Sequence, residues 1–138
     1  MSHPPGPPGI NAFLRAARTI AVVGASPDPM RSSHGVMRAL QGAGYRCIPV
    51  NPKETEILGE RCYKSLSDIP ADITIDIVDV FRRAEYAPAI AREAVARGAK
   101  CLWLQMGIVN DDAMDIARAG GLHAVQDECL AVVVRTLT

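Results

Sequence analysis

A short apolar run that ends in glycine, and then leads through a proline-rich loop to two serines, constrains the fold of this chain most. The run is Ile20–Val23, Gly24 follows it, and Ser32 and Ser33 open a stretch with helical spacing. A parallel α/β sheet connects its first strand to its first helix in this way. Because the first N–H groups of a helix have no partner within the helix, this connection can bind an anion. The pattern therefore points to a ligand that carries phosphate.

The remainder of the chain alternates between strand and helix patterns. Strands are expected at residues 19–23, 46–50, 72–80, 100–105 and 122–125, and helices at 10–17, 33–41, 84–97, 111–119 and 128–137. Residues 53–70 give mixed signals that fit a short hairpin and a helical turn, and a strand remains an alternative for residues 132–134. The prediction is an α/β fold with a five-stranded, mainly parallel sheet covered by helices on both faces. Ligands of such sheets bind outside the carboxyl ends of the strands.

Composition narrows the class of protein. The length of 138 residues suits one domain at residues 10–138, preceded by a flexible arm, rich in proline and glycine, at residues 1–9. Fifteen basic and fifteen acidic side chains cancel, so neither nucleic acid nor an anionic membrane is an expected partner. We find no apolar run near the ~20 residues of a membrane span and no apolar core of a signal peptide. Four widely separated cysteines predict a reduced, cytoplasmic protein without structural metal.

The first loop differs from the usual dinucleotide-binding turn. No G-x-G-x-x-G follows Gly24, so the narrow pyrophosphate turn of most NAD enzymes is missing. Ser32 or Ser33 occupies the expected N-cap, no acid lies in the first helical turn, and Arg31 and His34 can add positive charge. These features favour a phosphate site, with a capped helix and a solvated loop as the alternative.

The end of the second predicted strand also departs from NAD-binding domains. Those domains place an acid here to accept hydrogen bonds from the adenosine ribose, whereas this chain has Asn51, Pro52 and Lys53. A lysine suits a phosphate on that ribose, as in coenzyme A or NADP. A solvated surface lysine is the alternative.

Charged residues near the third strand have several possible roles. Asp79 either accepts a hydrogen bond from the ligand or caps the following helix, whereas Asp76 is expected to be paired or exposed at an edge rather than catalytic. Arg82 and Arg83 lie between a strand end and a helix start, where they can contact a ligand. A solvated or salt-bridged pair, with Glu85 as partner, is the alternative for the two arginines.

The fourth strand ends in Gln105, Met106 and Gly107, which face the same crevice. Asn110 and the two aspartates after it supply the next helix with a cap and negative charge, so this helix start is not expected to hold phosphate. No serine, cysteine or histidine shows the partners of a catalytic triad. No catalytic residue is therefore predicted.

Five separated blocks together resemble the small bacterial and archaeal CoA-binding proteins. The blocks, in order, are Ile20–Ser26, Ser32–Gly35, Val50–Lys53, Asp79–Arg82 and Trp103–Ile108. The similarity runs from about Ala12 to Leu137 and extends to the N-terminal CoA-binding domain of the succinyl-CoA synthetase α subunit. It implies a single Rossmann-like domain that binds coenzyme A or an acyl-CoA.

The resemblance and the strand ends together nominate a set of cofactor-binding residues. They are Gly24, Ala25, Ser26, Arg31, Ser32, Ser33, His34, Asn51, Lys53, Val80, Arg82, Gln105, Met106 and Gly107. In the synthetase-like pattern, the Ser32–His34 block meets the phosphates, Lys53 meets the adenosine phosphate, and residues 105–107 face the pantetheine.

The synthetase carries a phosphorylated histidine in a second domain, and no such domain follows here. The resemblance therefore implies CoA binding without catalysis by this chain alone. Two alternatives remain open. One is a small NAD(P)-binding redox enzyme or sensor, and the other is an accessory subunit whose surface, rather than its pocket, carries the function through an unidentified protein partner.

Overall fold

The computed structural model describes residues 9–137, and most of the predicted N-terminal arm lies outside this range. Five strands form a parallel sheet, as the sequence predicted: β1 (Thr19–Val23), β2 (Arg46–Val50), β5 (Ile77–Val80), β6 (Cys101–Leu104) and β7 (His123–Val125). The helices are α1 (Ile10–Ala16), α2 (Ser32–Gly42), α3 (Ala87–Arg97), α4 (Asp111–Ala119) and α5 (Leu130–Arg135). Residues 132–134 are thus helical.

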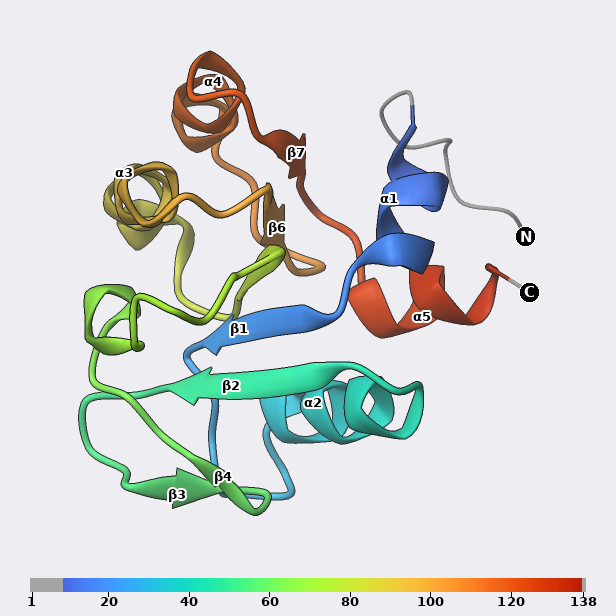
Figure 1. The fold of residues 1–138 in the computed structure, drawn as a ribbon, viewed down its shortest axis with the longest axis vertical. Coiled ribbons are helices and arrows are strands. Elements are labelled where there is room, and N and C mark those ends of the chain that lie inside the picture. Colours follow the sequence, from blue (N-terminus) through green and yellow to red (C-terminus); the bar gives the residue numbers. More distant parts are fainter. Residues whose placement is uncertain (1–8, 138) are drawn as a thin grey trace.

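Helices cover both faces of the sheet. Figure 1 shows α3 and α4 on one side of the strands and α1, α2 and α5 on the other. Alternate strand residues supply the two layers of the core: Val23, Val50 and Val80 face α3 and α4. Val22 and Trp103 instead pack on the opposite face with α1, α2 and α5. Burial on both faces explains why the strands read as nearly continuous apolar runs.

The strand order is β2-β1-β5-β6-β7. The chain first adds β2 on one side of β1 and then crosses over to add β5 on the other side. The order reverses between β1 and β5, so their carboxyl ends flank a crevice in which α/β proteins of this type bind ligands.

The segment with mixed sequence signals contains a hairpin and a helical turn. Strands β3 (Glu56–Ile57) and β4 (Glu60–Arg61) pair antiparallel, and η1 is a short 3₁₀ helix at Leu66–Asp68. Between the hairpin and η1 the chain returns to the end of β2. There the Tyr63 N–H donates to Pro49 O (3.0 Å) and the Asn51 N–H donates to Tyr63 O (2.9 Å).

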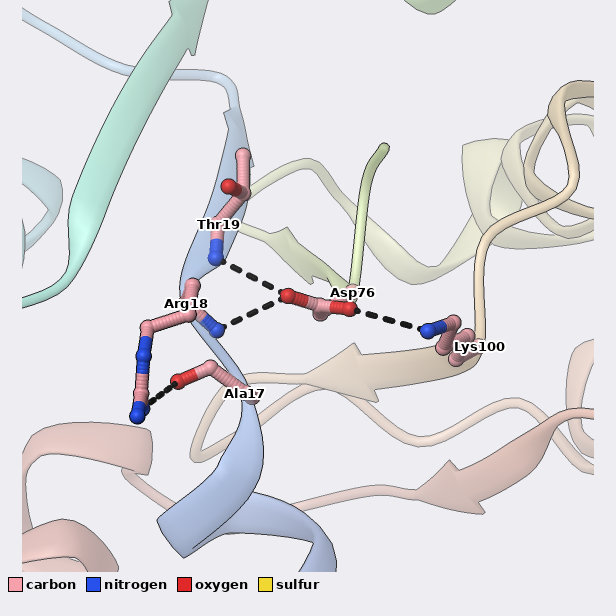
Figure 2. Close-up of polar contacts among 5 residues, drawn as sticks. All are labelled: Ala17, Arg18, Thr19, Asp76 and Lys100. Atoms are coloured by element: carbon pink, nitrogen blue, oxygen red, sulfur yellow. Dashed lines mark hydrogen bonds and ion pairs between the residues drawn. The ribbon is translucent and has the colours of Figure 1, made fainter. Parts of the chain in front are cut away.

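The third predicted strand is shorter than expected, because β5 begins only after Asp76. The Asp76 carboxylate accepts hydrogen bonds from the backbone N–H groups of Arg18 (2.8 Å) and Thr19 (3.1 Å), and it lies 3.5 Å from Lys100 Nζ (Figure 2). The carboxylate thus satisfies the backbone that leads into β1, and the expectation that Asp76 is paired is confirmed. The predicted helix at 84–97 also divides, into the 3₁₀ helix η2 (Ala84–Tyr86) and α3.

Candidate functional site

A pocket of about 390 Å³ lies at the carboxyl ends of β1, β2 and β5. Its lining residues are Val23, Gly24, Val50, Asn51, Pro52, Lys53, Lys64, Ser65, Leu66, Phe81, Arg82, Ile90 and Glu93. The pocket therefore brings together four of the nominated residues, from three strand ends that are far apart in the sequence. It opens on the α3 side of the sheet, at the reversal of strand order.

Gly24 fixes the shape of the pocket between β1 and β5. Its φ is +88°, and a Cβ at this position would lie 3.2 Å from the carbonyl carbon and oxygen of Phe81. Its N–H donates to Val50 O (3.0 Å). Only glycine combines this left-handed backbone with so close an approach to a neighbouring strand.

Asn51 joins the first loop to the end of β2. Its side-chain Nδ2 donates to Ala25 O (2.8 Å), and its Oδ1 accepts from the Lys53 N–H (2.8 Å). Both ends of the amide are used within the protein, so Asn51 positions the backbone of Lys53. The Lys53 side chain itself is exposed.

The two arginines after β5 differ. Arg82 lines the pocket and lies over the ring of Tyr86, with 4.5 Å between Cζ and the ring centroid. Arg83 Nε lies 3.4 Å from Glu85 Oε1 in an exposed ion pair, which confirms the salt-bridged alternative for this residue.

The sequence analysis missed several lining residues, among them Lys64, Ser65 and Glu93. Lys64 and Ser65 reach the pocket only because Tyr63 pairs with the end of β2. Glu93 is an exposed residue in the middle of α3. No local pattern in one sequence identifies such residues, since their position depends on contacts distant along the chain.

The start of α2 is more open than predicted. The N-cap is Arg31, with extended backbone and no side-chain cap, so the prediction of Ser32 or Ser33 as N-cap is wrong. The physical reason lies in the preceding loop, where Asp28 O accepts the Arg31 N–H (3.0 Å) and the turn ends one residue early. No acid lies in the first turn of α2.

The nominated residues of the first loop do not line the pocket. Ala25 and Ser33 are buried, Ser26 and His34 are half-buried, and Ser32 is exposed. Because α2 packs on the opposite face of the sheet from α3, the pocket and this helix start lie on the two sides of the same strand ends.

The end of β6 uses its polar groups internally. Gln105 is buried and its Oε1 accepts from the Leu130 N–H (3.1 Å), while the Gly107 N–H donates to Asp127 Oδ1 (2.7 Å). Met106 between them is 66% exposed. The start of the following helix is closed as predicted, because Asn110 Oδ1 accepts from the Ala113 N–H (2.9 Å).

Asp79 takes neither of the roles considered for it. Both carboxylate oxygens are buried and have no hydrogen-bond partner, so the side chain neither reaches the crevice nor caps a helix. Burial raises the pKa of Asp79 well above its ordinary value. Val80, the next residue and a nominated one, is fully buried in the core on the α3 side.

Comparison with known proteins identifies the family. Residues 18–135 match the family described as CoA binding domain. The chain belongs to this family. One relative of this CoA-binding domain is the uncharacterised protein YneT of Bacillus subtilis, which is 43% identical over 123 residues, covering 89% of this chain and 90% of YneT.

Two further similarities define the domain's relationships. A hypothetical protein from Pyrococcus horikoshii has a solved structure that superposes with a TM-score of 0.89 at 35% identity, covering 99% of each chain. The ADP-forming acetate–CoA ligase I of Archaeoglobus fulgidus is 26% identical over 126 residues, which cover 84% of this CoA-binding domain and only 18% of the ligase. The predicted α/β fold and the predicted family are confirmed. Within residues 9–137, no helix is long and apolar enough to cross a membrane.

Proposed function

We propose that this chain binds coenzyme A or an acyl-CoA at the carboxyl ends of its strands and catalyses no reaction of its own. The observation that carries the proposal is the pocket at the β1–β5 reversal, with Gly24 at its base and Lys53 at its rim, in a member of the CoA binding domain family. Ligand sites at such reversals are general in open parallel sheets.

The lining of the pocket suits the adenosine end of coenzyme A. Val50, Leu66 and Ile90 supply apolar surface for a flat base, and Lys53 supplies charge for the phosphate on the ribose. The diphosphate then crosses the strand ends toward the uncapped start of α2, where free N–H groups and the absence of acids favour an anion. The pantetheine continues toward Gln105, Met106 and Gly107.

The absence of catalysis rests on the chemistry of the pocket. Among the described residues that line it, none is a histidine or a cysteine. The one lining hydroxyl, Ser65 Oγ, lies within hydrogen-bond distance of Ser67 Oγ (2.9 Å) and Asp68 Oδ2 (3.1 Å). A nucleophile without a general base is not activated for attack.

Ligand-induced stabilisation tests the proposal. A ligand that binds only the folded state raises the melting temperature by mass action, so CoA should raise it and NAD or NADP at equal concentration should change it little. Mass spectrometry of natively purified protein should detect CoA or an acyl-CoA. Equal or greater stabilisation by NAD or NADP would favour the nucleotide-dependent redox protein instead.

A further inference from the structure

The pocket holds a second lysine that the strand ends alone do not supply. The chain has three lysines, Lys53, Lys64 and Lys100. Lys100 pairs with Asp76 at the amino end of the sheet, whereas Lys53 and Lys64 both line the pocket. No ion pair joins Lys53 or Lys64 to a carboxylate within the described part of the chain.

The backbone holds Lys64 in place beside the end of β2. Tyr63, the residue before it, forms a parallel bridge with Val50 and exchanges hydrogen bonds with Pro49 O and the Asn51 N–H, at 3.0 Å and 2.9 Å. Ser65, the residue after it, leads directly into the 3₁₀ helix η1. Lys64 therefore sits on a tethered segment and not on a free loop.

Lys53 is tethered to the same strand end from the other direction. Its N–H donates to Asn51 Oδ1, and the Asn51 N–H is the group that bonds Tyr63 O. The two lysines thus extend from segments that share Asn51 as an anchor, and both line one pocket.

The charge of the lining favours a phosphate with two negative charges. Lys53, Lys64 and Arg82 contribute three cations, and Glu93 contributes one carboxylate. Arg82 is engaged with the Tyr86 ring, which leaves the two lysines as mobile ammonium groups on flexible stems. Such groups can converge on one anion from two sides.

We propose that Lys64 is a specificity-determining residue that acts with Lys53 on the ribose phosphate of CoA. This inference rests on the proposed CoA binding and assigns Lys64 a role in it. The phosphate is the group that distinguishes CoA from dephospho-CoA, so the two lysines together set the preference between these ligands.

Titration calorimetry with CoA and dephospho-CoA tests the assignment at fixed ionic strength. Lys64→Ala should weaken CoA about tenfold and leave dephospho-CoA within about twofold, because a charge-assisted contact is lost only with the first ligand. The Lys53→Ala/Lys64→Ala double variant should bind the two ligands equally. Lys64→Arg, which keeps the charge, should retain a preference for CoA.

Arg92→Ala is the matched control, since Arg92 is an exposed cation on α3 that does not line the pocket. It changes the net charge equally and should leave the preference intact. Loss of the preference in Arg92→Ala as well would assign the effect to the general field and overturn the inference.

Two further results would overturn it in distinguishable ways. If the wild type binds CoA but Lys64→Ala weakens both ligands equally or neither, the role of Lys64 is wrong and the proposed function stands. If the wild type binds neither ligand, the proposed function and the inference fall together.

Discussion

The two ends of the sheet treat their charged groups in opposite ways. At the amino end, the Asp76 carboxylate is surrounded by Lys100 and two backbone N–H groups (Figure 2). At the carboxyl end, Lys53 and Lys64 line a pocket without an acidic partner among residues 9–137. The first arrangement stabilises the fold, and the second leaves charge available for a ligand.

The helix starts at the carboxyl end repeat this contrast on a smaller scale. The start of α4 is closed by the Asn110 side chain and by acids in its first turn, whereas the start of α2 has neither. A helix whose first N–H groups are already bonded gains little from an anion. Groups that the protein leaves unsatisfied at a strand end are therefore the better guide to a ligand than charge alone.

The largest effect is expected from Asp79, which contrasts with Asp76 within one strand region. Because burial raises its pKa above 3.8, the folded state holds a proton that the unfolded state releases. Stability of the wild type should fall as the pH rises above 3.8 toward the raised pKa. Asp79→Asn cannot ionise and should flatten this dependence, which urea denaturation at several pH values measures.

Asp76→Asn is the control for Asp79→Asn and should have the opposite sign. It removes the charge that Lys100 pairs with and should destabilise the fold near neutral pH. Equal pH slopes for the wild type and Asp79→Asn would show that Asp79 has a partner in solution.

The next effect compares lysines at the two ends. Lys53→Ala should weaken CoA by roughly 1.5–3 kcal/mol, about ten- to hundredfold, and barely change dephospho-CoA. Lys100→Ala removes the same charge at the amino end, where its ion pair is more than half exposed on the lysine side. It should leave CoA affinity unchanged and cost at most ~1 kcal/mol of stability. Calorimetry and denaturation separate the two, and equal affinity losses would contradict the contrast.

Two glycines with similar backbone sharpen the comparison further. Gly24→Ala and Gly98→Ala each place a side chain at positive φ, +88° and +78°, at a cost of about 1–2 kcal/mol. Only at Gly24 would the new Cβ also approach Phe81, and Gly98 lies away from the pocket. Thermal denaturation should show both losses, whereas calorimetry should show weaker CoA binding for Gly24→Ala alone. Unaltered CoA binding by Gly24→Ala would remove this glycine from the site.

The smallest effect tests the helix starts. Asn110→Ala removes a side-chain cap and should destabilise the protein by about 1 kcal/mol. Ser32→Ala should change stability by less than ~0.5 kcal/mol, because no side chain caps α2 and Ser32 is exposed. Urea denaturation compares the two, and a loss at Ser32 equal to that at Asn110 would show that α2 is capped in solution.

The sequence predicted best those elements whose ends carry a local signal. β1 and β2 match the predicted bounds, since Gly24 follows one apolar run and Asn51-Pro52 the other. The strand predicted at 72–80 was too long because Ile73 and Ile75 are also part of the core, although they lie outside the sheet. Apolar character reports burial, and only backbone pairing separates a strand from a buried loop.

The site was predictable to the same extent. Gly24, Asn51, Lys53 and Arg82 lie directly after strands, so strand prediction alone places them at one edge. Lys64 follows a two-residue strand and depends on the pairing of Tyr63 with Val50, a contact that one sequence does not encode locally. The N-cap of α2 was misassigned because the turn around Asp28, and not the serines, decides where the helix begins.

The Tyr63 segment has a consequence for solubility. The strand order leaves β2 at an edge of the sheet, and an exposed edge strand is a template on which another chain can add a strand. Pro49 has no N–H to offer, and Tyr63 occupies both the carbonyl of Pro49 and the N–H of Asn51. The segment that carries Lys64 to the pocket therefore also guards this edge against self-association. Damage to it would show first as aggregation of folded protein.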